Sequence, residues 1–188
     1  MSEEPVLERA GALLLELLRE NLVPSVLHEG DAIRITWPNS EEDYRVGVFL
    51  YDIEEARPYG TPAPVRMSDT QRRGASRVFA LHFLVYANRK VSFDGMTALD
   101  EMTLVEAVMR AVHNAPSGAL EGEPVTIRFD GLTCQEKVAL WQSMSTPLQP
   151  AVYLVMEPFV VPSTRLERLI PVREVQVQSR KKEVQRPL

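Results

Sequence analysis

The chain has 188 residues, of which 45% are hydrophobic and 25% charged, and its formal net charge is −5. This composition is typical of soluble globular proteins, and the length suits one domain with a well-buried core rather than two ordinary domains. The acidic balance argues against nucleic acid or anionic lipid as a partner, and the single cysteine rules out an internal disulfide and a multi-thiolate metal site.

The N-terminal segment predicts one amphipathic helix. Apolar residues from Val6 to Leu22 recur at helical spacing, Ser2 is a suitable N-cap, and Pro24 marks the end of the helix. The chain begins Met-Ser-Glu-Glu, which is acidic where a secretory signal needs Lys or Arg, and no apolar run reaches the roughly 20 residues that span a bilayer. We therefore expect a soluble, cytoplasmic product.

Three segments of the first half predict strands. Ile33, Ile35 and Trp37 alternate with polar residues, which indicates a half-exposed edge strand or the arm of a hairpin. Residues 46–53 and 77–87 are continuous apolar runs rich in β-branched and aromatic side chains. We expect both to be central strands that are covered on both faces.

Residues 55–76, between these two central strands, predict a loop. The segment is rich in proline and glycine and carries the arginines Arg57, Arg66, Arg72 and Arg73. A structureless connection of more than about 15 residues is uncommon in a compact domain and is usually functional or disordered. Two interpretations stay open, a solvated flexible loop and a contact surface.

The second half predicts two capped helices. Thr97 and Asp100 form a capping box before an apolar stripe of Leu104, Val108, Ala111 and Val112. Thr133 and Glu136 form another, and they open a short helix whose apolar face comprises Cys134, Val138, Trp141 and Met144.

Two further strands flank the short helix. Residues 125–129 alternate as in a one-sided strand, and residues 151–157 are typical of a buried strand, any continuation of which Pro158 and Pro162 confine to a sheet edge or a bulge. The chain then becomes polar. Val175 and Val177 are compatible with one last short strand, and the residues from Arg180 onward predict a mobile terminus.

Local signatures of catalysis are missing from the sequence, including phosphate loops, nucleophile elbows and zinc motifs. A general base is one interpretation of His82, but a core histidine bonded to backbone is favoured. Cys134 could be activated at a helix start, yet its place on the apolar face favours packing. The acidic groups at 41–43, 54–55 and 100–101 flank element ends, as caps and solvated charges do. We predict no enzyme activity, cofactor or metal.

Four segments, taken in order, carry a resemblance to a known family. They are Val46-Gly47-Val48-Phe49-Leu50-Tyr51, residues 81–87, residues 104–114, and residues 132–144 with Thr146-Pro147-Leu148. Together they resemble the cap, or tube-terminator, proteins of contractile injection systems of the virulence-cassette and antifeeding-prophage type. The fourth segment is the most specific, because it is similar to the family's Leu-x-x-Glu-x-x-x-Leu-Trp-x-x-Leu-x-Thr-Pro signature, with Met144 at the last Leu. Residues 55–76 and the tail after Pro162 are less typical of the family.

The resemblance implies an α/β (α+β) fold, in which about three helices pack on a mixed, mainly antiparallel sheet of about four to six strands, as in tail terminators. It implies a single domain over residues 1–162 and an extended, partly flexible segment over 163–188 that contacts neighbours. It also implies a structural subunit, about six copies of which form a ring that ends the inner tube and contacts the last sheath ring. An adaptor or baseplate-type component of the same class of machine is the alternative.

The expected partners are other copies of the chain, the inner tube protein and the sheath protein, with no nucleic acid, membrane or small-molecule substrate. The protein would be made in the cytoplasm and assembled into a phage-tail-like particle. A closed ring needs two different patches on each subunit, and strand edges, loops and tails commonly supply them. The candidate interface residues are therefore Ile33, Ile35, Trp37, Arg57, Arg66, Arg72, Arg73, Arg180, Lys181 and Lys182.

Overall fold

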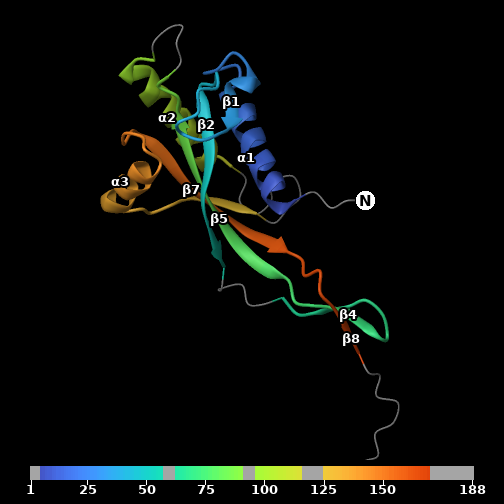
Figure 1. Cartoon of the computed structure of the whole chain (residues 1–188). Coiled ribbons are helices and arrows are strands. Elements are labelled where there is room, and N and C mark those ends of the chain that lie inside the picture. Colours follow the sequence, from blue (N-terminus) through green and yellow to red (C-terminus); the bar gives the residue numbers. More distant parts are fainter. Residues whose placement is uncertain (1–4, 57–61, 91–95, 116–124, 170–188) are drawn as a thin grey trace, which may run out of the picture.

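A five-stranded sheet runs through the middle of the molecule, with the strand order β1-β2-β5-β7-β6 (Figure 1). The computed structural model describes residues 5–56, 62–90, 96–115 and 125–169. β1 pairs parallel to β2, and every other neighbouring pair in this sheet is antiparallel. The strands are β1 (Ile33–Ile35), β2 (Val46–Glu55), β5 (Arg77–Ala87), β6 (Thr126–Phe129) and β7 (Ala151–Val161).

Helices cover both faces of this sheet. On one face, α1 (Val6–Leu22) and α2 (Ala98–His113) bury their apolar stripes against alternate residues of the strands, such as Phe83 and Val85. On the other face, α3 (Cys134–Ser143) packs against the residues between them, such as Leu84 and Tyr86. Side chains of successive strand residues point to opposite faces, so an uninterrupted apolar run serves both layers. This arrangement confirms the predicted fold class.

Trp141 holds α3 to the sheet. Its side chain is fully buried, its indole Nε1–H donates to the Tyr153 hydroxyl at 2.8 Å, and its ring meets Tyr86 edge to face with centroids 6.0 Å apart. Gly47 leaves room for Tyr86, because a Cβ at that position would lie 2.2 Å from the Tyr86 Cζ. The Tyr86 hydroxyl in turn lies 3.0 Å from that of Tyr44. The tryptophan of the fourth resembling segment is thus a packing residue.

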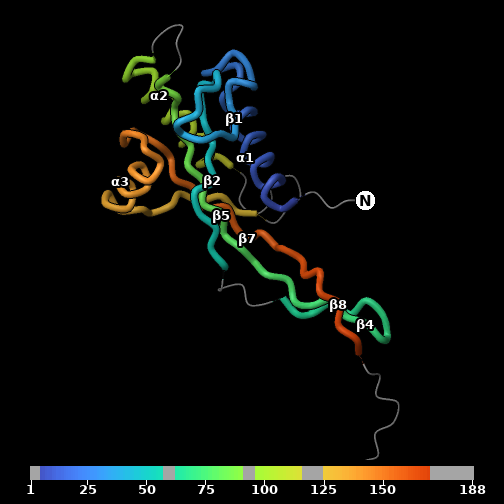
Figure 2. The backbone as a smooth tube through the Cα atoms, viewed as in Figure 1, coloured from blue at the N-terminus to red at the C-terminus, as the bar shows by residue number. Residues whose placement is uncertain are grey.

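A second, three-stranded sheet forms an arm that projects from the main sheet (Figure 2). Its strands, in the order β3-β4-β8, are β3 (Val65–Arg66), β4 (Gln71–Arg73) and β8 (Leu166–Arg168). β4 precedes β5 in the chain and β8 follows β7, and the two short strands pair antiparallel as β5 and β7 do. The arm therefore continues the ribbon that β5 and β7 begin in the main sheet.

The arm corrects the prediction of a structureless loop over residues 55–76. In that segment the structure describes residues 55–56, where β2 ends, and residues 62–76, which contain β3 and β4 paired with each other. The other partner of β4 is β8, which lies about 95 residues further along the chain, in the segment that we expected to be an extended tail. Proline, glycine and arginine mark local turns and charge, but strands this short carry no periodicity of their own.

The other predicted elements match closely. The bounds of α1 and β5 are those expected, and both capping boxes are present at Thr97 and Thr133. α1 has its N-cap at Pro5, without a side-chain cap, and Ser2 lies outside the described residues. β7 extends through Pro158 to Val161, and because β6 pairs only as far as Glu157, this extension has β5 alone beside it in the main sheet. This agrees with the prediction that any continuation of the strand past Pro158 lies at a sheet edge or a bulge.

Candidate interaction surfaces

The free edge of the main sheet is less available than the sequence predicts. Ile33 is fully buried in the core, so it cannot contact a neighbour in this form of the subunit. Ile35 is half exposed and packs its Cδ1 over Gly11 of α1. Trp37 lies beyond the end of β1, is 66% exposed, and stacks obliquely on Phe49 with ring centroids 4.9 Å apart. Ile35 and Trp37 therefore remain the exposed apolar residues of this edge.

Four of the five arginines of the arm fall into two groups, and the fifth, Arg165, lies 3.6 Å from Glu167. Arg66 donates to Asp69 at 3.0 Å across the β3–β4 turn, and Arg72 pairs with Glu167 of β8 at 2.7 Å. Arg73 of β4 and Arg168 of β8 make no ion pair with any other described residue. These two guanidinium groups can therefore engage another molecule without breaking a contact within the arm.

Four of the predicted interface residues, Arg57, Arg180, Lys181 and Lys182, lie outside the described residues. So do Val175 and Val177, for which a short strand was expected. Their place in an interface stays a prediction.

The arm also exposes apolar side chains that the sequence reasoning missed. Val65 and Met67 of the β3–β4 hairpin and Leu166 of β8 are each more than half exposed, and Val160 and Val161 at the base of the arm are also exposed. The alternation of apolar and charged residues in Val-Arg-Met is a weak signal for a strand, but three residues are too few to separate a strand from a turn, and Leu-Glu-Arg does not alternate.

A second apolar surface lies on α2. Leu99, Met102 and Met109 are 72%, 62% and 48% exposed, and their helical spacing places them on the outer side of the helix, away from the buried Leu104 and Val108. Within the described residues, nothing in the subunit covers this stripe.

An open cleft with a volume of about 470 Å³ lies at the end of the main sheet where β2 starts and β5 ends. It has an acidic lining: Glu29, Asp31, Glu41, Glu42 and Asp43 contribute five carboxylates, and Arg34, Arg45 and Lys90 contribute three cations. Two of those cations bind main-chain carbonyls, Arg34 that of Asp31 and Lys90 that of Asn39. The acidic group at 41–43, expected to be ordinary solvated charge, thus borders a concave surface.

The carboxylates at 100–101 behave differently from one another. Asp100 caps α2 as expected, and its bonds to Thr97 lower the pKa of the Asp100 carboxyl. Glu101 is buried rather than solvated, and Arg89 donates to it through two nitrogens at 2.9 and 2.7 Å. This bidentate pair fixes the start of α2 to the residues that follow β5.

His82 contacts carboxylates rather than the backbone. Its Nδ1 lies 2.7 Å from the Asp130 Oδ2, which also accepts the Tyr51 hydroxyl at 2.6 Å. Since an ionised carboxylate only accepts, the Nδ1 carries the proton, and the buried Nε2 lies 3.8 Å from the Glu54 Oε2. Partial burial opposes ionisation of Asp130, but the hydrogen bonds from Tyr51 and His82 outweigh it and lower the pKa of the Asp130 carboxyl. Burial, followed by the bond to Asp130, raises the pKa of Tyr51.

The histidine cluster corrects the prediction that His82 binds backbone. Tyr51 and Asp130 are 31 residues before and 48 residues after His82, and the strand order brings the three together. Among the described residues, the side chains in contact with His82 are those of Asp130, Glu54 and Tyr51. The arrangement ties β2, β5 and the end of β6 to one another.

Cys134 is exposed, which contradicts the prediction that it packs in the core. Among the described residues, no group of three or more His, Cys, Asp and Glu side chains is placed to hold a metal ion. A search of the same residues finds no helix with the length and hydropathy to cross a bilayer.

Comparisons with known proteins agree with this picture. The family model described as the Pvc16 N-terminal domain matches residues 10–174. The fold is similar to that of the PVC sheath/tube terminator in its extended state, from an extracellular contractile injection system, with a TM-score of 0.66 and 15% identity over 97% of this chain. It is also similar to the tube-terminating cap of the anti-feeding prophage, with a TM-score of 0.62 and 17% identity over 94% of this chain. Among curated proteins, none matches the sequence.

The chain is shorter than the solved proteins that it resembles. It spans 66% of the length of the terminator chain and 62% of that of the cap chain, less than two thirds in each case.

Proposed function

This chain belongs to the Pvc16 N-terminal domain family, and we propose that it is a structural subunit that ends the inner tube of an extracellular contractile injection system. The observation that carries the proposal is the similarity of fold over nearly the whole chain to two proteins described as tube terminators. The segments of the sequence that resemble cap proteins lie within the matched range, and their central tryptophan anchors α3.

The proposal includes a ring of about six copies that binds the tube end and contacts the last sheath ring. Exposed apolar surface supports it, because residues such as Leu99 and Leu166 stand open to solvent at 72% and 60% and mark surfaces that an assembly would cover. The ring would be built in the cytoplasm and leave the cell with the particle. We also propose that the subunit has no catalytic role, since its buried polar clusters join structural elements to one another.

The test is to purify the chain, add preformed tubes of the cognate tube protein, and examine the mixture by light scattering and negative-stain electron microscopy. The expected result is a ring at the tube end and an arrest of tube elongation. A chain that never associates with tube ends would overturn the proposal.

Deleting the gene from its host separates the proposal from a baseplate role. Loss of a terminator should give tubes of uncontrolled length, because nothing stops their polymerisation. Loss of a baseplate component should give no particles at all, and that result would replace the proposed role.

A further inference from the structure

The arm and the rest of the chain carry opposite charge. The described residues of the arm, 62–76 and 162–169, contain the five arginines Arg66, Arg72, Arg73, Arg165 and Arg168 against two carboxylates, Asp69 and Glu167. The whole chain has a formal charge of −5, so the excess of carboxylates lies elsewhere. When one subunit has a basic surface and an acidic surface, electrostatic attraction favours association between copies of that subunit.

The described residues of the arm form no core of their own. Of the described arm residues only Gly74 is buried, whereas Val65, Met67 and Leu166 are 54%, 51% and 60% exposed. A small sheet needs a covered apolar face or packing against another element for independent stability. The exposed apolar side chains, together with the guanidinium groups of Arg73 and Arg168, which pair with no carboxylate of the described residues, therefore make this surface one that another protein would complete.

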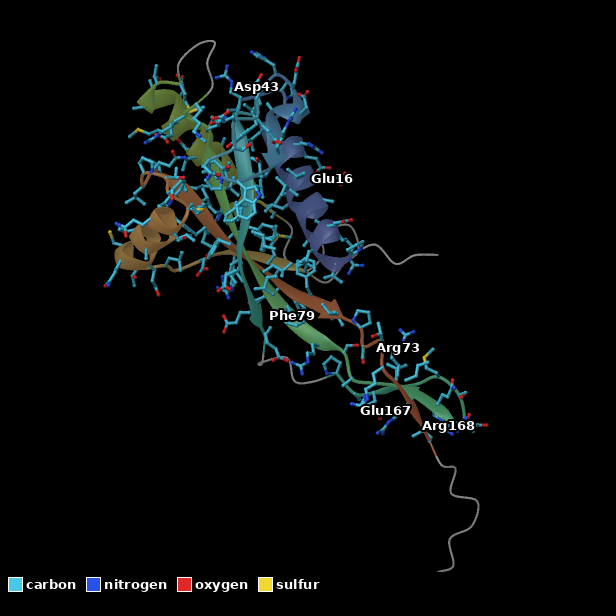
Figure 3. All side chains as sticks on the ribbon, viewed as in Figure 1. Glu16, Asp43, Arg73, Phe79, Glu167 and Arg168 are labelled. Atoms are coloured by element: carbon cyan, nitrogen blue, oxygen red, sulfur yellow. The ribbon has the colours of Figure 1, made fainter. Side chains whose placement is uncertain are left out.

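The acidic cleft offers the complementary surface. In the described part of the chain, none of the carboxylates of Glu29, Asp31, Glu41, Glu42 and Asp43 forms an ion pair. Figure 3 shows Asp43 at one end of the elongated molecule and Arg73 and Arg168 at the other. The continuous strands β5 and β7 lie between these ends, so the two surfaces of one copy are kept apart.

We propose that the basic arm of one copy docks into the acidic cleft of the next copy, and that this head-to-tail contact closes the ring. This inference rests on the proposed function. Two different patches that complement each other on the same chain define a heterologous interface, which gives a ring when the rotation between copies closes. Arg73 and Arg168 pair with carboxylates of the cleft, notably Glu42 and Asp43, and the apolar side chains of the arm lose their exposure in the contact.

A charge-reversal cycle on the full chain tests the contact. The arm variant carries Arg73→Glu and Arg168→Glu, and the cleft variant carries Glu42→Lys and Asp43→Lys. Mass in solution is measured by light scattering, with and without tubes. Each variant alone should weaken self-association on the order of 100-fold, since like charges then face each other across the contact. Both changes in one chain should restore the ring, and so should an equimolar mixture of the two variants when the ring has an even number of copies.

The matched control is Arg110→Glu on α2, which reverses an exposed arginine that belongs neither to the arm nor to the lining of the cleft, and it should leave the ring intact. Restoration by the combined variant also shows that the reversed chains are folded. Rings that persist in the arm variant, or a combined variant that stays dissociated, would overturn the inference.

The outcome for tube ends is read separately. If the arm variant forms rings but no longer binds tubes, the arm contacts the tube or sheath, so the inference fails while the proposed function stands. If wild-type copies stay monomeric on tube ends, the inference fails in the same way. The proposed function is contradicted as well only if the wild-type chain does not bind tube ends.

Discussion

Replacing Trp141 by alanine should cost the domain a large part of its stability. A buried tryptophan removes about 150–250 Å² from water, which at about 25 cal/mol per Å² corresponds to about 4–6 kcal/mol. Partial collapse of α3 onto the sheet would relieve some of the cavity, so we expect a loss of about 3–5 kcal/mol, as measured for similar truncations. The substitution also leaves the buried Tyr153 hydroxyl without its indole donor.

Urea unfolding followed by far-UV circular dichroism measures this change as a difference in the free energy of unfolding. Trp37→Ala is the matched control, because the chain has two tryptophans and Trp37 is 66% exposed with Phe49 as its aromatic neighbour. The control should cost less than about 1 kcal/mol. Trp141→Phe should fall between the two, since it retains part of the ring packing but loses the hydrogen bond.

The reasoning fails if Trp141→Ala destabilises the domain no more than Trp37→Ala does. That outcome would mean that α3 is held by other contacts. It would also mean that the tryptophan of the family-like segment serves something other than packing.

Three further predictions concern single positions. Gly47→Ala places a Cβ 2.2 Å from the Tyr86 ring and should cost about 1–3 kcal/mol in urea unfolding, because the ring is confined by its neighbours. Thr133→Ala removes the N-cap of α3 and should cost about 1 kcal/mol in the same assay. Asp130→Asn should destabilise the domain at neutral pH. The pKa of Asp130 in the folded domain lies below its ordinary value of 3.8, so the ionised carboxylate contributes stability above pH 3.8. The difference in stability between wild type and the variant should therefore shrink as the pH falls below 3.8 and through the folded pKa.

Each of these has its own control. Gly131→Ala, where a Cβ meets nothing within 4 Å, should change stability little, and an equal cost at both glycines would contradict the steric argument. For the cap, Ser143→Ala at the other end of α3 should be nearly neutral. A difference between wild type and Asp130→Asn that stays constant from pH 7 to acid would show that the carboxylate does not gain its stability from the bonds with Tyr51 and His82.

The body of the fold could be predicted because its signals are local. The stripe of α1, the capping boxes at Thr97 and Thr133, and the apolar runs of β2 and β5 each lie within one segment, so composition and periodicity suffice. The arm could not be predicted in this way. β4 pairs with β8, and pairing between segments so distant in sequence produces no local pattern in either segment.

The candidate surfaces show the same division. Arg72 and Arg73 were identified from charge alone, but which of them is already paired depends on Glu167 across the arm. Ile33 alternates like an exposed-edge residue, yet α1 and the neighbouring strand bury it. His82 was singled out correctly as unusual, whereas its partner Asp130 was overlooked because a lone carboxylate after a short strand has no distinguishing pattern.

The two-stranded ribbon of β5 and β7, which carries the arm, limits how the length of the arm can change. Side chains alternate between the two faces of a strand, so one residue added to the ribbon between β4 and β5 would exchange the face that carries Arg73 with the face that carries Arg72. Lengthening that preserves both sides requires two residues in each strand, about 6.8 Å at a time. Arm length is therefore stepped rather than continuous, and finer adjustment to a neighbour calls for a bulge or a change of twist.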